Sequence, residues 1–271
     1  MTIKEALLAT ICYADVFDYP LTLEEVEKWL IGIRGKQVRS GQASKRKMLQ
    51  DISGITSKDG YIFLRGRTRI LTLRKQRAVW AGPKVQLAKH AAALLKIIPT
   101  IKLIGVTGGL AMDNAHEHDD IDFYIATCRK TIWVTRFLAT VLLEIYKLRR
   151  KPQDTEFQNK ICLNMYVDED HLGVVLKERD LFSAHEVLQL KPLWERDNTY
   201  EKFLNHNRWV KKYLPNAWGV KVESRKSKVE SRKSWMHSVL FSICHVTCMI
   251  LEPVFRWFQL WYMQKRRSSE V

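Results

Sequence analysis

The sequence predicts an α+β protein in which a mixed sheet follows a helical N-terminal module. Three observations lead to this prediction. The N-terminal quarter has three stretches of helical periodicity followed by a short hairpin pattern. Between residues 99 and 170, short apolar runs typical of buried strands alternate with helical patterns. Beyond residue 171 the periodicity is again helical, so we expect helices to cover a sheet at the centre of the chain.

The N-terminal helices and hairpin are expected to form a winged-helix-like module. Residues 3–14 have apolar positions at helical spacing, and Thr22 with Glu25 forms a capping box at the start of a second helix. A third helix is expected over residues 43–52 and a hairpin over residues 55–65. This order is typical of a winged helix-turn-helix, but a module that only packs on its neighbour has the same order.

The changes in pattern divide the chain into six expected parts. They are the winged-helix-like module (1–66), a connecting helix broken at Gly82-Pro83 (67–98), the sheet-containing core (99–170), a helical region (171–217), a charged linker (218–234) and an apolar C-terminal helix with a basic end (235–271). The linker contains the heptad KVESRKS twice in tandem, a composition too polar to form a packed core.

Positive charge is concentrated in the N-terminal third. The chain has 45 Lys and Arg against 29 Asp and Glu, for a net charge of +16. Residues 33–86 alone hold 14 basic and two acidic residues, a net charge of +12. This excess favours a polyanionic partner, so one expectation is that residues 33–86 bind nucleic acid; a solvated basic face is the alternative.

The cysteines and the C-terminal region bear on localisation. Five scattered cysteines and an N-terminus without signal-peptide features predict reduced thiols in a cytoplasmic protein. The first apolar stretch of the C-terminal helix, residues 235–251, is shorter than the about 20 residues that span a bilayer. Three interpretations of residues 235–267 stay open. They are packing on the domain or on a second subunit, contact with a membrane surface, which the basic residues 265–267 would suit, and a membrane span.

The segment between residues 106 and 125 carries the features expected of a catalytic site. Asp120 and Asp122 alternate with apolar residues, so both carboxylates should project from one face of a strand, where they can share Mg²⁺. Gly108-Gly109 lies between a strand and a short helix, and glycines there let backbone amides approach a phosphate. Together these features predict phosphoryl-transfer chemistry.

The order of this segment resembles the signature of the polymerase-β-like nucleotidyltransferase superfamily, in particular its minimal bacterial members. In that signature a Gly-Gly or Gly-Ser pair is followed, at about the spacing found here, by Asp-hydrophobic-Asp. The resemblance implies a nucleotidyltransferase core in which Asp120 and Asp122 hold Mg²⁺ and Gly108 and Gly109 bind the phosphates of a nucleoside triphosphate. Residues 1–217 also resemble a bacterial group that joins a winged-helix-like region to this core.

The sequence departs from the superfamily signature at two places. A third carboxylate usually lies inside a later strand, where it serves as metal ligand and general base. The expected strand has Asn164 in that region, and an amide is no base, so Asp168 at the end of the strand is the candidate to replace it. Asp113 stands where the superfamily commonly has glycine or another small residue.

Two functions follow from this resemblance. The first is a Mg²⁺-dependent enzyme that transfers a nucleotidyl group, with AMP as the expected group, from a nucleoside triphosphate to an acceptor that the sequence does not identify. The alternative is a nucleic-acid-binding or antitoxin-like regulator whose nucleotidyltransferase domain is degenerate and no longer catalytic.

Overall fold

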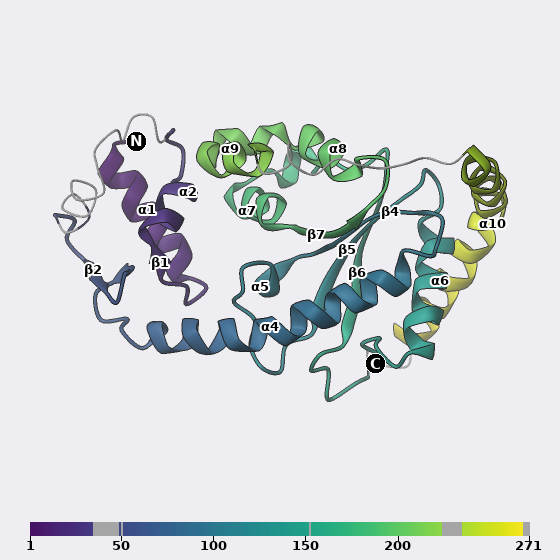
Figure 1. The fold of residues 1–271 in the computed structure, drawn as a ribbon, viewed down its shortest axis with the longest axis horizontal. Helices are drawn as coiled ribbons and strands as arrows, with labels where there is room; N and C mark the ends of the chain where they lie inside the picture. The colour runs from purple at the N-terminus through teal and green to yellow at the C-terminus, as the bar shows by residue number, and fades with distance from the viewer. Residues whose placement is uncertain (35–48, 50, 152, 224–234, 268–271) are drawn as a thin grey trace.

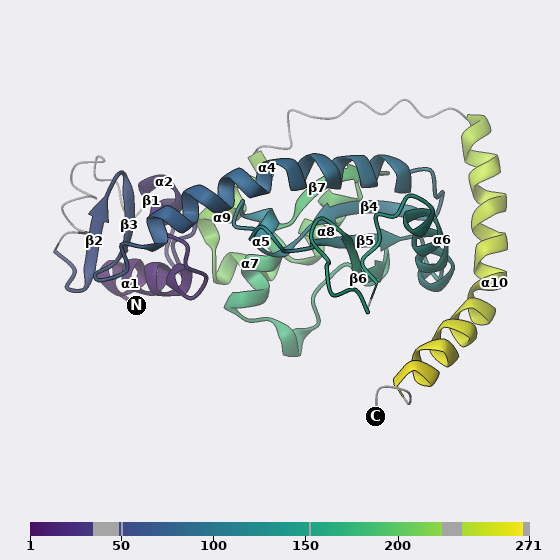
Figure 2. The same cartoon turned by 90° about the horizontal axis from the view of Figure 1, so that it is seen from below.

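The computed structural model describes residues 1–34, 49, 51–151, 153–223 and 235–267, with only the backbone described at 164, 220–223, 235–244 and 265–267. The N-terminal module lies at one end, a sheet with helices on both faces forms the middle, and the long helix α10 lies at the opposite end (Figure 1). The long helix α4 starts at the module and continues along the central sheet (Figure 2).

The N-terminal module combines two helices with a small antiparallel sheet. Its elements are α1 (Ile3–Asp15), β1 (Leu21–Thr22), α2 (Leu23–Lys28), β2 (Ile55–Lys58) and β3 (Tyr61–Leu64). The strand order is β1-β3-β2. Thr22 and Glu25 form the predicted capping box, and the hairpin turn has φ values of 52° at Asp59 and 81° at Gly60, as a type I′ turn requires. Most of the third helix predicted over 43–52 lies outside the described residues.

Helix α4 (Ile70–Leu95) is continuous, so the predicted break at Gly82-Pro83 is wrong. Proline within a helix removes one backbone hydrogen bond and costs about 3 kcal/mol. Here α4 is held on both sides of the proline, because Ala81 and Ala88 are buried against the core and the ammonium group of Lys84 donates to Asp119 O at 2.6 Å. Tertiary packing therefore keeps the helix intact.

The central sheet is mixed, as predicted, with the order β6-β5-β4-β7. Its strands are β4 (Ile101–Val106), β5 (Ile121–Thr127), β6 (Ile161–Asp168) and β7 (Lys191–Glu195). β4 pairs antiparallel with β5 and β7, whereas β5 and β6 are parallel. The edge strand β7 is absent from the prediction because it is short, contains Pro192 and follows a helix directly.

The two faces of the sheet bury different helices. Ile121, Phe123 and Ile125 of β5 pack on one face with residues of α4 and of α6 (Ile132–Ile145). Tyr124 and Ala126 point the other way, into a core shared with the N-terminal module. The helices of that second face are α7 (Leu181–Gln189), α8 (Thr199–His206) and α9 (Pro215–Glu223). By strand alternation, the side chain of residue 122 also belongs to the second face.

Several basic residues of the 33–86 region join the module to the core. The Arg77 guanidinium, which is buried, donates to Phe17 O at 3.0 Å and to Asn114 Oδ1 at 3.1 Å. Arg74 pairs with Glu25 at 2.8 Å, and Arg67 pairs with Asp15 at 3.0 Å. These cations neutralise acids of the protein itself. Part of the predicted basic surface is therefore structural, while Lys45, Arg46 and Lys47 lie outside the described residues.

The C-terminal apolar helix forms as predicted. α10 (Trp235–Arg267) packs against α6 and contains Pro253 within its length. Among the described residues, no helix is both long and apolar enough to cross a membrane.

Candidate active site

Asp120 and Asp122 lie together at the start of β5. Ile121 and Phe123 are fully buried on the opposite face, so alternation turns both carboxylates toward the face covered by α7. A carboxylate oxygen of each aspartate and the Cys162 sulfur all lie within 4.8 Å of one another. The predicted acidic pair is thus present, and the third group beside it is a thiol.

Cys162 reaches the pair because β6 runs parallel to β5 in a register that places Cys162 beside Asp122. The register shifts immediately afterwards, since Tyr124 pairs with Met165 and one extra residue of β6 is accommodated at 163–164. Burial and the charges of Asp122 and Asp120 raise the pKa of the Cys162 thiol to about 12. The thiol therefore stays protonated near neutral pH.

Arg150 fixes one member of the pair. Its Nη1 lies 2.5 Å from Asp120 Oδ2, and its guanidinium lies 4.5 Å from the centre of the Phe157 ring. A hydrogen bond to Asp120 raises the pKa of Arg150 above its ordinary value. A permanent positive charge therefore stands at the edge of the site, as is common where phosphates are bound.

The donor set fits Mg²⁺ through its two carboxylates. Mg²⁺ is usually held by one or two protein carboxylates, with water and substrate phosphate oxygens completing the shell. Asp120 and Asp122 supply two hard oxygen ligands, whereas the protonated Cys162 thiol is a poor partner for a hard ion. Of the two, Asp120 also carries the ion pair with Arg150.

The Gly108-Gly109 turn lies directly against the acidic pair. Gly108 has a φ of 64°, and a Cβ placed on it would come within 3.3 Å of Asp122 Oδ2. A Cβ on Gly109 would come within 3.1 Å of Asn114 O. The backbone conformation of Gly108 favours glycine, and at both positions a Cβ would be tightly packed against its neighbour. The two motifs that sequence analysis singled out are adjacent in space.

Glu186 of α7 lies on the same face of the sheet as the acidic pair, and the sequence did not indicate it as a site residue. Burial and the nearby Asp122 charge raise the pKa of Glu186, while the backbone N–H of Gly108 acts in the opposite direction. A protein carboxylate therefore lies near the backbone amide that a phosphate oxygen would be expected to use.

A cavity of about 280 Å³ adjoins the glycine turn on the side of the N-terminal module. It is lined by Gly108, Gly109 and Glu186 and by a group of aromatic side chains, Tyr13, Phe17, Tyr19, Trp29, Phe182 and His185. The His185 ring stacks on Tyr13 at 4.1 Å between ring centres. Burial lowers the pKa of His185 to about 3, so the imidazole is neutral.

The structure does not bring Asp168 to the acidic pair. Asp168 pairs with Thr127 at the far end of β5, and the five steps along the strand from Asp122 to Thr127 span about 17 Å at the usual rise per residue. The Asp168 carboxylate instead accepts from the Asp170 backbone N–H and lies 2.5 Å from the His171 ring. Asp168 therefore cannot replace a third carboxylate beside Asp122.

The backbone conformation accounts for Asp113, the other departure from the signature. Asp113 has a φ of 54°, the left-handed conformation that glycine adopts readily, and its carboxylate pairs with Lys191 at 2.8 Å. The loop that follows is held locally, since His116 N–H donates to Asp119 Oδ2 at 2.7 Å. His116 and His118 are not part of the acidic cluster found among the described residues.

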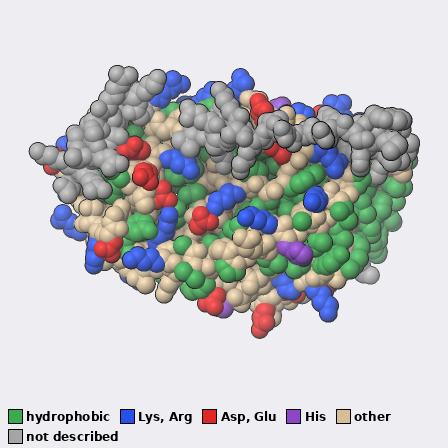
Figure 3. All heavy atoms as spheres, in the orientation of Figure 1, with side chains coloured by type: hydrophobic (Ala, Val, Ile, Leu, Met, Phe, Trp, Pro, Cys, Tyr) green, Lys and Arg blue, Asp and Glu red, His purple; other side chains and the backbone are tan. Residues whose placement is uncertain are grey.

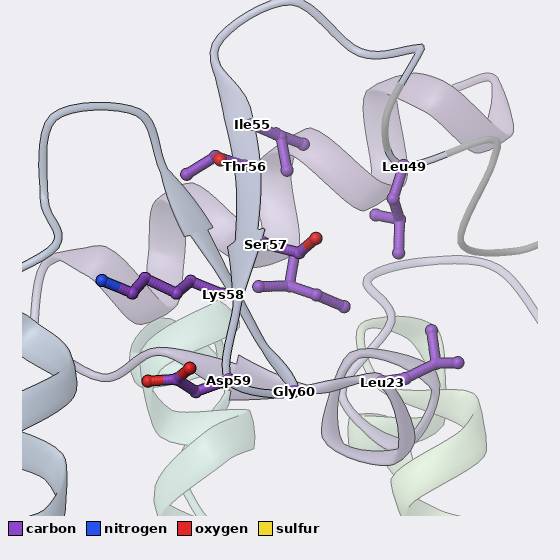
Figure 4. Close-up of a pocket in the computed structure, with 9 residues that line it drawn as sticks. Leu23, Leu49, Ile55, Thr56, Ser57, Lys58, Asp59 and Gly60 are labelled. Carbon is purple, nitrogen blue, oxygen red and sulfur yellow. The ribbon is translucent and has the colours of Figure 1, made fainter.

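A separate hollow of about 260 Å³ lies beside the hairpin of the N-terminal module (Figure 4). Leu23, Leu49 and Ile55 project into it from different elements, and Lys58 and Asp59 lie at one end. It has none of the residues of the acidic cluster in its lining.

Comparisons with known proteins leave the family of this chain open. No protein-family model and no curated protein matches the sequence. Among solved structures, a mutant of the toxin–antitoxin pair MntA–HpeT is similar, with 17% identity, 51% of this chain and 93% of that chain covered, and a TM-score of 0.28. A toxin–antitoxin structure with AMP-PNP is similar at 14% identity, with 50% and 97% covered and a TM-score of 0.28. TM-scores this low do not establish a shared fold.

Proposed function

We propose that the protein is a nucleotidyltransferase that binds a nucleoside triphosphate with Mg²⁺ and transfers its nucleotidyl group to an acceptor. The observation that carries the proposal is the convergence of the Asp120 and Asp122 carboxylates with a glycine turn that packs against Asp122. The resemblance of this segment to the polymerase-β-like superfamily makes AMP the expected group.

The residues of the site have complementary roles in this proposal. Mg²⁺ held by Asp120 and Asp122 would offset the negative charge that develops on the phosphate oxygens during transfer. The backbone amides of Gly108 and Gly109 donate hydrogen bonds to the phosphates. Arg150 orients the Asp120 carboxylate through their ion pair and adds a positive charge at the edge of the site.

The acceptor hydroxyl or amine must lose a proton during transfer, and the β6 residue paired with Asp122 is not a carboxylate. The residue of β6 beside Asp122 is Cys162, whose raised pKa keeps it protonated. A positioned general base typically contributes about 10² to 10⁴ in rate. We therefore expect slow transfer by the natural sequence.

A nucleotide-binding regulator without turnover is the second candidate. Two observations favour it: the thiol at the position beside Asp122, and the Glu186 carboxylate near the Gly108 amide. Both would impair catalysis more than they would impair the fold. The two candidates differ in whether a product forms, so one assay separates them.

The test is incubation of the full chain with each α-labelled nucleoside triphosphate, Mg²⁺ and candidate acceptors, including the protein itself. We expect slow release of pyrophosphate with transfer of label, and loss of both in the Asp120→Asn, Asp122→Asn double variant. Label transfer that persists in the double variant would place the chemistry elsewhere. Binding of nucleotide without any product would favour the regulator.

A further inference from the structure

The outer face of α10 exposes large apolar side chains at helical spacing. Val246, Ile250, Val254 and Trp257 follow one another at intervals of three or four residues and are between 55% and 72% exposed. Phe258, Tyr262 and Met263 add further exposed apolar surface nearby. Hydrophobic side chains gather at the edge of the molecule where Figure 1 places α10 (Figure 3).

The opposite face of α10 is fixed to α6 by specific contacts. Both Glu252 carboxylate oxygens accept backbone N–H groups at the start of α6, from Trp133 at 2.8 Å and Val134 at 2.9 Å. Gln259 Nε2 donates to Trp133 O at 2.7 Å, and the Phe255 ring lies 4.8 Å from that of Phe137. These contacts set the rotation of α10 about its axis, so the outer face is presented in a defined orientation.

Positive charge flanks this apolar face. A groove of about 590 Å³ between α10 and the start of α6 is lined by Lys130, Arg256, Trp133 and Trp257 among others. Glu252 also lines it, but its carboxylate is engaged by the amide groups of α6. Lys130 and Arg256 therefore place positive charge beside the apolar face.

Aromatic and aliphatic side chains beside Lys and Arg are the composition of helices that lie in the interface of a membrane. Tryptophan and tyrosine favour the boundary between headgroups and acyl chains, and the cations favour anionic headgroups. A second copy of the chain would bring these positive charges against one another.

We propose that the outer face of α10 binds an anionic phospholipid surface. Ile250, Val254 and Trp257 enter the boundary of the acyl region, and Lys130 and Arg256 contact lipid phosphates. This inference does not depend on the nucleotidyltransferase proposal, since it uses none of the residues of that site. In this proposal α10 holds the protein at a membrane surface.

The experiment is flotation of the full chain with phosphatidylcholine vesicles that contain or lack phosphatidylglycerol. We expect binding to the anionic vesicles alone and weakening of binding as salt rises. The Ile250→Ser, Trp257→Ser double variant should bind about tenfold or more weakly, because its apolar contact is lost. The Lys130→Ser, Arg256→Ser double variant should lose about fivefold for each cation removed.

A matched control is the Val79→Ser, Leu176→Ser double variant, which changes residues 72% and 79% exposed elsewhere on the protein and should bind like the wild type. Vesicles with brominated acyl chains provide a second measurement, because they should quench the fluorescence of wild type more than that of Trp257→Ser. Wild type that stays unbound with anionic vesicles would overturn the proposal. A wild-type dimer that Trp257→Ser converts to a monomer would assign the face to a second copy instead.

Discussion

At one end of β6, Cys162 lies beside Asp122, and at the other end Asp168 bonds to the exposed ring of His171. The carboxylate has the chemistry of a general base but lies about 17 Å along the sheet from the acidic pair, by the usual rise of a strand. The Cys162 thiol lies beside the acidic pair, but it stays protonated and so cannot act as a base. The comparison shows that strand register decides which side chain can complete a site, and that residue type alone does not.

Among changes to β6, the largest effect is expected from moving a carboxylate to the end beside Asp122. Cys162→Asp would place a third carboxylate beside Asp122 and should raise turnover with Mg²⁺ by about 10², at the lower end of what a general base contributes. The measurement is pyrophosphate release by wild type and variant. Affinity for Mg²⁺ is a second readout, and it should rise as well.

Asn164→Asp is the matched control for that substitution, since it adds a carboxylate two residues further along the same strand, where the register shifts. It should leave turnover unchanged. If Asn164→Asp raises turnover and Cys162→Asp does not, the register argument is wrong and position 164 completes the site.

Nucleotide affinity tests the role of Glu186. Its carboxylate lies near the Gly108 amide and Asp122, where its negative charge repels a phosphate. Glu186→Gln removes this charge and should raise affinity for ATP with Mg²⁺ about tenfold, the size of one charge–charge interaction near a protein surface. Calorimetry measures the change, and Glu178→Gln on the exposed turn before α7 is the control. Lower affinity in Glu186→Gln would mean that this carboxylate assists metal binding.

The pH dependence of stability tests the burial of His185 beside the site. Its pKa of about 3 in the folded protein lies below the ordinary value of 6.5, so between these values the unfolded chain binds more protons. Stability should therefore fall as pH is lowered through this window, by up to about tenfold per pH unit in the unfolding constant. His185→Phe should show a smaller fall in denaturant titrations. Equal slopes for the two proteins would indicate that His185 is accessible to protons.

The smallest effect is expected at the far end of β6. Asp168→Asn should leave turnover and Mg²⁺ affinity unchanged, because the carboxylate interacts with Asp170 and His171 and not with the acidic pair. It should lower stability only slightly, since the His171 ring is exposed and solvent screens the pair. Turnover that falls with Asp168→Asn would return Asp168 to the catalytic site.

Local chemistry made much of the fold predictable. The Thr22 capping box, the Asp59-Gly60 turn and the alternation through Ile121 and Asp122 each depend on neighbouring residues, and the structure has the corresponding elements. The glycine turn and the acidic pair likewise belong to one short segment of the sequence, with Gly109 eleven positions before Asp120. Their contact in space follows from a strand, a short helix and an antiparallel return.

Long-range packing explains what the sequence did not indicate. Helix α4 continues through Pro83 because both halves are held by the core. The position of Cys162 depends on the pairing of β5 with β6, which no local pattern sets. Glu186 meets Gly108 only after α7 has packed on the second face of the sheet. Alternation on β5 indicated which face Asp122 occupies but not which helix covers it.

Calorimetric titration of the full chain with ATP, with and without Mg²⁺, tests the central claim most directly. Wild type should bind ATP only in the presence of Mg²⁺, because Asp120 and Asp122 would otherwise repel the triphosphate. The Asp120→Asn, Asp122→Asn double variant should remain folded, as judged by its melting transition, and lose Mg²⁺-dependent binding by more than about 10², as loss of both metal ligands requires. Unchanged affinity in the folded double variant would contradict the assignment of this site.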